Sequence, residues 1–416
     1  MSDALAVYLI LFMCLSPPLR ALLVELPRGR SIRLPASQRL PPSLKPYHRR
    51  MEGRHIAVIG GGINGVMSAW ALLDRGYRVS LFEAGQLIGA TSRASSKMLH
   101  GGLRYLEQGR IGMVREALLE RRWWLERGTG LAAPFRMHIP LYRGKGRPGW
   151  MIRAGTLLYD LLALGSKLPR SARHSRDDTL AAIPGLQEQG LLGSVSYWDV
   201  RMDDEALGRW AAEQLIRRGL QCHSGLPILR LATNGELECA GKVRKFDAVV
   251  NATGPWATQL LEQSGIACPW KLLAVRGSHL VVARPLREGC LFQQDDGRVV
   301  FYLPFRNLAI LGTTEARADP RDPVCASETE VEELLAIHAR HVRPALRRDE
   351  IVEVMAGLRP IVVPRGKEGA DTRTASRESL TVRTGKVVTL LGGKWTTARQ
   401  QGLSVADEID RICGRT

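Results

Sequence analysis

A glycine-rich segment at residues 55–83, HIAVIGGGINGVMSAWALLDRGYRVSLFE, constrains the fold of this chain more than any other feature. The apolar run at 56–59 predicts a buried parallel strand, and Gly60, Gly62 and Gly65 follow it in the G-x-G-x-x-G spacing. Apolar residues then recur at helical period before a second apolar run. The segment therefore predicts a strand, a tight turn, a helix and a second strand, which open a Rossmann-like α/β domain.

Each glycine has a physical role in a dinucleotide site. The turn needs positive φ, the backbone must approach a pyrophosphate closely, and the helix must pack against the strand. The pyrophosphate would accept from unpaired N–H groups at the helix N-terminus, and Glu83 would accept from a ribose hydroxyl. The alternative is a glycine-rich turn in an ordinary α/β unit. Strand, helix, second strand and acid are all in register, which favours a bound dinucleotide.

The net charge of +18 over 416 residues narrows the classes of partner. The length allows two domains with sizeable cores, and 45% apolar residues are typical of a globular protein. Such a charge attracts nucleic acid, anionic lipid or an acidic substrate. The basic residues are spread along the chain without the aromatic interleaving of single-strand binders. Nucleic acid is therefore not expected, whereas an anionic membrane surface stays open.

The cysteines and histidines form no metal or disulfide pattern. The seven cysteines are scattered without a C-x-x-C pair, which indicates a reducing compartment. His338 and His341 lie three residues apart without the carboxylate of an H-E-x-x-H motif. We therefore expect solvated helix histidines and no metal site.

Residues 1–50 differ from the rest of the chain. Their apolar run at 4–14 is too short to span a bilayer, and no positive charge precedes it as in a signal peptide. A proline- and arginine-rich tract follows, and Met51 stands just before the first strand. We expect translation to start at Met51, with the extension an upstream artefact or a disordered tail. An interfacial membrane anchor is the alternative.

Two further segments have a chemical signature. Residues 89–107, GATSRASSKMLHGGLRYLE, are dense in hydroxyls and glycines, which suits a loop whose amides satisfy the phosphates and ring oxygens of a cofactor. A flexible serine loop is the alternative. Near the C-terminus, a predicted hairpin ends at Gly393 and Lys394 opens the last helical segment. This gives a second place where backbone amides point at an anion or a polar ring.

Short strands dominate the second half of the chain. Asn234-Gly235 predicts a two-residue hairpin turn, and the apolar run within 246–254 predicts a buried strand that returns to the first sheet. Residues 276–283, 298–304 and 308–313 predict strands of a second, mostly antiparallel sheet. We assign this second sheet to a substrate domain.

Seven motifs, in order, resemble those of one family. They are GGGINGV (60–66), ATSRASSKMLHGGLRYLE (90–107), NATGPW (251–256), RGSHLVV (276–282), ILGTTE (310–315), GLRP (357–360) and GGKWTT (392–397). Together they are similar to the FAD-dependent glycerol-3-phosphate dehydrogenases, within the D-amino-acid-oxidase-like flavoproteins. The resemblance spans nearly all of residues 54–405, and the long serine and glycine block is more specific than the glycine triplet.

The resemblance implies FAD rather than NAD as the cofactor. It implies oxidation of sn-glycerol 3-phosphate to dihydroxyacetone phosphate, with electrons passed to quinone or another acceptor. It also implies a cytoplasmic protein, peripheral on the inner face of the cytoplasmic membrane, and allows a homodimer. Two other functions stay open: an FAD-dependent amine or amino-acid oxidase of the same fold, and a non-catalytic flavin-binding protein.

The resemblance also implies site residues. The substrate phosphate would be bound by Arg104, Tyr105, Arg359, Arg377 and Lys394, and the catalytic residues would be His279 and Arg359. His279 is the candidate base because an imidazole titrates near working pH, with a structural histidine as the alternative. The cofactor-binding residues are expected to be Gly60, Gly62, Ile63, Asn64, Glu83, Thr91, Ser92, Ser95, Ser96, Lys97, His100, Gly101, Gly102, Ala252, Gly254, Gly393, Lys394, Thr396 and Thr397.

The expected architecture is α/β, with an FAD-binding Rossmann-like domain of the glutathione-reductase-2 or D-amino-acid-oxidase type interleaved with a substrate domain built on an antiparallel sheet with helices. The FAD-binding domain is expected over 51–110, 190–258 and 355–416, and the substrate domain over 111–189 and 259–354. Two features depart from the family pattern. The sequence stops at Thr416 without the helical C-terminal domain of the bacterial respiratory enzymes, and Trp395 and Ala398 replace a leucine and a tyrosine.

Overall fold

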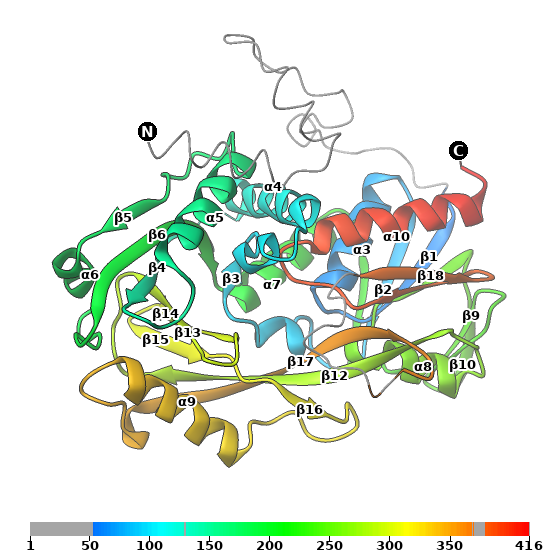
Figure 1. Cartoon of the computed structure of the whole chain (residues 1–416). Coiled ribbons are helices and arrows are strands. Elements are labelled where there is room, and N and C mark those ends of the chain that lie inside the picture. Colours follow the sequence, from blue (N-terminus) through cyan, green and yellow to red (C-terminus); the bar gives the residue numbers. More distant parts are fainter. Residues whose placement is uncertain (1–52, 129, 368, 370–378, 416) are drawn as a thin grey trace, which may run out of the picture. The chain divides into compact units, whose positions relative to one another are not determined.

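Two β-sheets organise this computed structural model, which describes residues 53–128, 130–367, 369 and 379–415 (Figure 1). The expectations for residues 1–50, and the assignment of Arg377 to the phosphate site, lie outside the described residues. The description that follows therefore concerns the chain from residue 53 onward.

The first sheet has six strands. Their order is β18 (Leu380–Thr384), β19 (Val387–Leu391), β11 (Ala248–Asn251), β1 (His55–Ile59), β2 (Arg78–Glu83) and β7 (Gln221–Ser224). β1 pairs in parallel with both β2 and β11, so the chain leaves this sheet and returns to it as predicted. The C-terminal hairpin of β18 and β19 is also confirmed.

The central strand of this sheet is buried on both faces. Ile56 and Val58 belong to one hydrophobic core, and Ala57 and Ile59 belong to another. This two-sided burial is why the strand reads as a continuous apolar run rather than an alternating one. On the first face lie the helices α3 (Ile63–Asp74), α7 (Asp204–Arg217) and α10 (Ala398–Cys413). α10, in red in Figure 1, packs along α3.

The second sheet is larger and mostly antiparallel. Its order is β16 (Ala316–Ala318), β12 (Trp270–Val282), β15 (Leu308–Gly312), β14 (Val299–Phe305), β13 (Gly289–Gln293), β4 (Ala132–Tyr142), β6 (Leu191–Met202) and β3 (Met98–Leu99), with β17 (Ile351–Pro364) paired to β12 and β5 (Ala172–His174) paired to β6. Among the described strands of this second sheet, only β13 and β4 pair in parallel. The three strands predicted within 276–313 are confirmed.

Two long strands of this sheet were not predicted. β4 and β6 pair along most of their length, yet they bury polar side chains such as His138, Ser194 and Asp199. These residues break the alternation of apolar and polar positions that identifies a half-buried strand. β6 also lies within 190–258, the segment that the sequence assigned to the cofactor domain, although it pairs with β4 of the expected substrate domain.

Smaller elements complete the fold. A three-stranded sheet of β8 (Ile228–Leu231), β9 (Glu236–Cys239) and β10 (Lys242–Lys245) contains the hairpin predicted around Asn234-Gly235, and α8 (Ala257–Gln263) packs on β8. The remaining helices are α4 (Ile111–Arg127), α5 (Gly149–Leu162), α6 (Arg176–Ala182) and α9 (Glu328–His341). Among the described residues, no helix has the length and hydropathy needed to cross a membrane.

The two helix histidines of α9 correct one expectation. His338 is fully buried, where its Nδ1 accepts a hydrogen bond from the Leu346 amide, and His341 stacks on Phe292. They are therefore packed residues rather than solvated ones. A helix face can carry histidine into a core when its ring finds a backbone donor and an aromatic neighbour.

Candidate functional site

The glycine turn after β1 has room only for glycine. Gly60 has φ of +101°, and a Cβ added there would lie 2.4 Å from the Ala252 carbonyl oxygen. A Cβ added at Gly65 would lie 1.8 Å from the Gly60 carbonyl oxygen. The turn therefore brings α3 directly against β1 and β11, which leaves the N-terminal amides of α3 at the carboxyl end of the sheet.

Glu83 lies at the end of β2, beside this turn. Its two carboxylate oxygens accept hydrogen bonds from the amides of Gly61 (2.6 Å) and Gly85 (2.7 Å). These bonds fix the carboxylate at the switch point where a ribose hydroxyl would be expected. Sequence reasoning gave the residue, and the structure adds the backbone donors that orient it.

The loop at residues 89–107 is held from both sheets rather than flexible. The Ser92 hydroxyl accepts from the Ile63 amide at 2.9 Å, and the Ser92 carbonyl accepts from Trp395 Nε1 at 2.9 Å. Ser96 Oγ lies 2.9 Å from Nε2 of His279 on β12. The His100 amide donates to Thr396 Oγ1 at 3.2 Å. The loop therefore bridges the nucleotide turn, the C-terminal turn and the second sheet.

A buried ion pair anchors the middle of the same loop. Lys97 Nζ lies 2.5 Å from Asp204 Oδ1, and Ser95 Oγ donates to the other oxygen of Asp204 at 2.6 Å. Burial raises the pKa of Asp204, and Lys97 opposes that rise. The side chains of Ser95 and Lys97, both expected at the cofactor, are thus engaged with α7. The sequence did not single out Asp204 as a site residue, because acidic residues are common at helix N-termini.

A second buried network holds the end of the loop. The Gly101 amide donates to the Tyr159 hydroxyl at 2.7 Å, and that hydroxyl donates to Asp199 at 2.8 Å. Arg121 lies 2.6 Å from the same Asp199 oxygen. Burial raises the pKa of Asp199, opposed by Arg121. This network joins α4, α5 and β6 beneath Gly102, whose φ of +75° turns the chain toward Tyr105.

The turn after β19 offers unsatisfied polar atoms. Asn64 Oδ1 and Gln401 Oε1 are buried and have no hydrogen-bond partner among the described residues. A Cβ added at Gly393 would lie 2.5 Å from Asn64 Nδ2 and 2.6 Å from Gln401 Oε1. Buried polar atoms normally have a partner, so these fit a polar group bound beside the turn. Thr397 Oγ1 already accepts from Gln401 Nε2 at 2.9 Å.

The other expected cofactor residues lie around the same turns. Thr91 opens the short helix η2 (Thr91–Arg93), and Gly254, with φ of +62°, opens η4 (Gly254–Trp256) directly after β11. A Cβ added at Gly102 would lie 2.4 Å from the Tyr105 ring. Three features together fit an extended dinucleotide cofactor. They are the glycine turn, the loop at residues 89–107 (the pinned loop), and the buried side-chain oxygens of Asn64 and Gln401 that have no partner among the described residues.

His279 lies on β12 in a dry environment. Its side chain is 2% exposed, Nε2 meets Ser96, and the buried Nδ1 has no partner among the described residues. Burial lowers the pKa of His279 to about 3, with further lowering by Arg359 and Lys97. The expectation that this imidazole titrates near working pH is therefore wrong for the ligand-free protein, because the ring is held neutral.

Arg359 lies on β17, which pairs with β12 so that Arg359 is opposite Val275. Its Nη2 donates to Thr313 Oγ1 at 2.7 Å, and its Nη1 lies 3.5 Å from Glu315 Oε1. A Cβ added at Gly277 would lie 2.5 Å from the guanidinium, so this glycine makes room for it. Because Arg359 lowers the pKa of His279, these two predicted catalytic residues lie within electrostatic reach of each other.

Lys394 and Tyr105 are far apart in the sequence but lie close together in the structure. Lys394 Nζ lies 4.3 Å from the centroid of the Tyr105 ring and 3.5 Å from Met113 Sδ. Tyr105 and the half-buried Arg104 belong to the short helix η3 (Leu103–Leu106). Within the part of the chain that the structure describes, neither Lys394 nor Arg104 has a carboxylate partner. A cation without an ion-pair partner over Tyr105, with a second on the same short helix as Tyr105, fits an anionic ligand.

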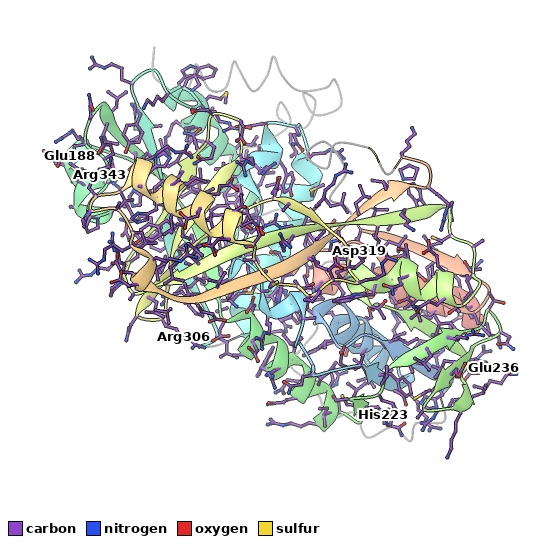
Figure 2. All side chains as sticks on the ribbon, turned by 90° about the horizontal axis from the view of Figure 1, so that it is seen from below. Glu188, His223, Glu236, Arg306, Asp319 and Arg343 are labelled. Atoms are coloured by element: carbon purple, nitrogen blue, oxygen red, sulfur yellow. The ribbon has the colours of Figure 1, made fainter. Side chains whose placement is uncertain are left out.

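Many other basic side chains are paired. Arg306 lies 2.8 Å from Asp203, and Arg321 lies 2.5 Å from Asp319. One member of each pair, Arg306 and Asp319, is labelled in Figure 2. Exposed pairs of this kind contribute little to stability, but they account for much of the basic surface without a ligand. The cations that lack such partners therefore indicate a ligand site better than the net charge does.

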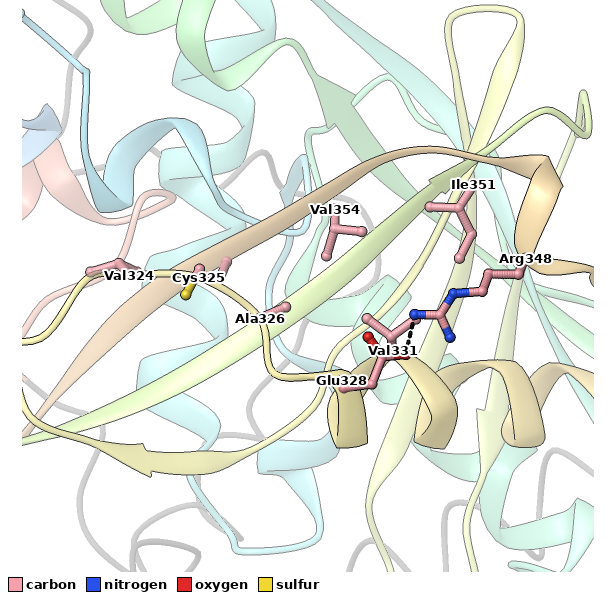
Figure 3. Close-up of a pocket in the computed structure, with 9 residues that line it drawn as sticks. Val324, Cys325, Ala326, Glu328, Val331, Arg348, Ile351 and Val354 are labelled. Atoms are coloured by element: carbon pink, nitrogen blue, oxygen red, sulfur yellow. Dashed lines mark hydrogen bonds and ion pairs between the residues drawn. The ribbon is translucent and has the colours of Figure 1, made fainter.

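A separate cavity of about 400 Å³ lies between α9 and β17 (Figure 3). Val331 of α9 and Val354 of β17 line it, together with Cys325 from the preceding segment. The ion pair of Arg348 with Glu328 closes one side. None of the predicted site residues lines this cavity, so it is distinct from the site around the glycine turn.

The sequence matches known proteins over most of its length. A family model described as FAD dependent oxidoreductase matches residues 55–397. The aerobic glycerol-3-phosphate dehydrogenase of Escherichia coli is 34% identical over 375 residues, which cover 84% of this chain and 72% of that protein. The glycerol-3-phosphate dehydrogenase of Pseudomonas tolaasii is 34% identical over 390 residues, covering 88% and 74%. The D-erythritol 1-phosphate dehydrogenase of Brucella abortus is 32% identical over 360 residues, covering 82% and 71%.

Solved structures agree on the fold. The glycerol-3-phosphate dehydrogenase from Bacillus halodurans, complexed with FAD, superposes with a TM-score of 0.68 at 22% identity, covering 87% of this chain and 65% of that chain. Glycine oxidase from Geobacillus kaustophilus superposes with a TM-score of 0.63 at 20% identity, covering 86% and 95%. The expected architecture is therefore confirmed, and the dinucleotide that the site fits is FAD.

Proposed function

Because this chain belongs to the family of FAD-dependent oxidoreductases, we propose that it oxidises sn-glycerol 3-phosphate to dihydroxyacetone phosphate. The observation that carries the proposal is the contact of Lys394 with Tyr105, the neighbour of Arg104 on η3, with no ion pair to a carboxylate for either cation among the described residues. Relatives named glycerol-3-phosphate dehydrogenase, at 34% identity over most of the chain, support it.

The phosphate is the charged group by which the protein would bind this substrate. A phosphate monoester carries about −1.5 to −2 charges at neutral pH. Arg104 and Lys394 supply fixed positive charge in a half-buried setting, where attraction is stronger than in water. Binding energy from this remote group would orient C2 of the substrate for reaction. Arg377 remains part of the proposed phosphate site from the sequence alone.

The reacting end of the substrate is assigned to His279 and Arg359. FAD, when bound, supplies the acceptor for the hydride that leaves C2. His279 is neutral, and its Nδ1 has no partner among the described residues, so it would accept the hydroxyl proton. Burial is the main cause of the low pKa of His279, and Arg359 lowers it further. A dianionic ligand near Arg359 would offset that second contribution and make the ring a stronger base when substrate is present.

We propose quinone as the electron acceptor, reached at the inner surface of the cytoplasmic membrane. The support is the resemblance to respiratory enzymes together with the strongly basic sequence. A homodimer stays a prediction from the sequence. Peroxide release measured against quinone reduction during turnover tests the acceptor, because an oxidase would form peroxide in proportion to substrate consumed.

Anaerobic bleaching of the bound flavin tests the substrate. We expect glycerol 3-phosphate to bleach the flavin absorbance of the purified holoprotein within seconds. Erythritol phosphate is the second probe, since a relative at 32% identity is named for that substrate. Bleaching by glycine alone would assign the protein to the amino-acid oxidases. Bleaching by none of these would indicate a non-catalytic flavin-binding protein.

A further inference from the structure

The carboxylate of Glu330 is buried in the first turn of α9, where the helix packs against β12 (Figure 1). One of its oxygens, Oε2, accepts from the Ser327 amide at 2.9 Å and completes the capping box of the helix. Nε and Nη2 of Arg276, on β12, lie 2.8 and 2.7 Å from the same oxygen. The cap and the ion pair together account for Oε2.

The other oxygen of Glu330, Oε1, is bound from outside the helix. The Thr314 hydroxyl donates to it at 2.7 Å, and the Ser278 hydroxyl donates to it at 2.9 Å. Ser278 and Thr314 are also joined to each other, since the Ser278 amide donates to Thr314 Oγ1 at 2.9 Å. Both residues are buried. Glu330 therefore ties β12 to the segment that directly follows β15.

A second capping box in the chain shows what a helix cap alone requires. At the start of α6, Asp178 is exposed and accepts from the amide and the hydroxyl of Ser175 with one oxygen, Oδ2. Burial acts to raise the pKa of Glu330, but its hydrogen-bond donors, the Ser327 amide first among them, lower it to about 2. Glu330 is therefore a charged group in a buried place, which a cap alone does not need.

The segment 312–314 touches both residues assigned to the reacting end of the substrate. Gly312 on β15 pairs with His279 on β12, and a Cβ added at Gly312 would lie 2.3 Å from Cδ2 of that imidazole. Thr313 Oγ1 accepts from Arg359 Nη2 at 2.7 Å. A displacement of this segment would therefore move both the imidazole and the guanidinium.

We propose that Glu330 is a positioning residue for His279 and Arg359. It holds the segment 312–314 from one side, and it holds Ser278, which directly precedes His279 on β12. The proposal rests on the proposed function, because the roles of His279 and Arg359 come from there. A misplacement of reacting groups by about 1 Å can cost about 100-fold in rate, so a residue that touches no reacting atom can still set the rate.

Stopped-flow flavin reduction in the full-length holoprotein tests the proposal. Glu330→Gln keeps a capping residue of the same size but leaves one acceptor oxygen instead of two. Thr314→Val removes a hydrogen bond to Oε1 without changing a residue of α9. At saturating glycerol 3-phosphate, each variant should reduce its flavin at least about tenfold more slowly than the wild type, with FAD content unchanged. The substrate concentration at half-maximal rate should stay within about twofold, because the phosphate site is unaltered.

The matched control is Ser327→Ala, which removes a hydroxyl from the Oε2 side of the same carboxylate. It should lower the unfolding temperature and leave the rate of flavin reduction at the wild-type value. Thr314→Ser, which keeps the hydroxyl, should recover most of the rate that Thr314→Val loses. The double variant Glu330→Gln, Thr314→Val should be no slower than the slower single variant, because both changes act on one hydrogen bond.

A wild-type rate of flavin reduction in either Glu330→Gln or Thr314→Val would overturn the proposal. So would equal slowing by Ser327→Ala and Thr314→Val, because the effect would then belong to the start of the helix rather than to the bonds of Oε1.

NMR signals of the His279 ring separate this proposal from the proposed function. In substrate-free holoprotein with isotope-labelled histidine, these signals are identified by their loss in His279→Gln. Thr314→Val should shift them, and Ser327→Ala should not. Shifted signals in a protein that glycerol 3-phosphate does not bleach would refute the substrate assignment and leave the positioning role intact. Unshifted signals in Thr314→Val, with normal bleaching of the wild type, would refute the positioning role alone.

Discussion

The two ends of the site are built from different materials. The nucleotide end is made of backbone: a glycine turn, the N-terminus of α3, and amides that fix Glu83. The substrate end is made of side chains that come from η3, β12, β17 and the turn after β19. Backbone geometry tolerates almost no change of residue, whereas separate side chains contribute separately. A substitution at the nucleotide end should therefore either abolish cofactor binding or leave it intact. A substitution at the substrate end should remove only part of the activity.

The largest effect is expected from Gly65→Ala. The added Cβ would lie 1.8 Å from the Gly60 carbonyl oxygen, so α3 must move away from the turn. We expect the purified variant to contain no FAD, measured as flavin absorbance per protein. The control is Gly112→Ala in α4, where an added Cβ meets nothing within 4 Å. A yellow Gly65→Ala protein would show that the turn is more tolerant than its geometry indicates.

His279→Gln should leave FAD content unchanged and lower kcat. Removal of a general base typically costs about 10²- to 10⁴-fold in rate. Glutamine can keep a hydrogen bond to Ser96, which limits structural change. Stopped-flow flavin reduction under saturating glycerol 3-phosphate measures the effect. Wild-type reduction rates in this variant would assign His279 a structural role only.

Arg104→Met and Lys394→Met should act by degrees. A hydrogen bond to a charged group contributes about 1.5–3 kcal/mol, so each change should lower kcat/KM about 10- to 100-fold, mainly through KM. Inorganic phosphate should compete with glycerol 3-phosphate. It should raise the apparent KM of the wild type more than that of either variant. Arg306→Met, which breaks an exposed pair with Asp203, is the control and should have no effect on KM.

Acid should destabilise the protein through its neutral histidines. The pKa of His279 is about 3 and those of His338 and His341 are about 4, all lowered chiefly by burial from 6.5. Between these values and 6.5 the unfolded chain binds protons that the folded chain does not, so stability falls as pH falls through this window. Each histidine contributes a slope of up to about 1.4 kcal/mol per pH unit. Urea unfolding of His338→Gln at pH 7 and pH 5 should give a smaller difference than the wild type, and an equal difference would contradict the assignment.

The smallest effect is expected from Trp395→Leu, which restores the residue of the family pattern. The change removes the hydrogen bond to the Ser92 carbonyl and the contact with Trp124, whose ring centroid is 4.9 Å away. A loss of about 1–2 kcal/mol would lower the temperature of FAD release by a few degrees. Trp150→Leu, at an exposed position, is the control and should not alter FAD release.

The same difference between local backbone and distant side chains decides what could be predicted from the sequence. The glycine turn and its two strands lie within 30 residues, so spacing alone identified Gly60, Gly65 and Glu83. The strands within 276–313 were evident because their apolar residues and turn signals are local. β4 and β6 were missed because buried polar residues such as His138 and Asp199 hide their strand pattern.

The supports of the site were beyond sequence reasoning. Asp204, on a helix more than 100 residues away in the sequence, accepts a hydrogen bond from Ser95 of the pinned loop. Tyr159 of α5 accepts a hydrogen bond from the Gly101 amide. Neither residue stands in a motif, and each bond exists only after the two sheets are assembled. The loss of basicity at His279 likewise depends on burial and on Arg359, which no local pattern reports.

The bond between Trp395 and Ser92 has a consequence for synthesis of the protein. It joins positions 303 residues apart, and β19 and α10, which complete the first sheet and its cover, also come from the last part of the chain. A ribosome would release β1, α3 and β2 long before these partners exist. The nucleotide turn would thus be unable to hold its cofactor until β19 and α10 had been translated, and chains truncated before them would leave the ribosome without flavin.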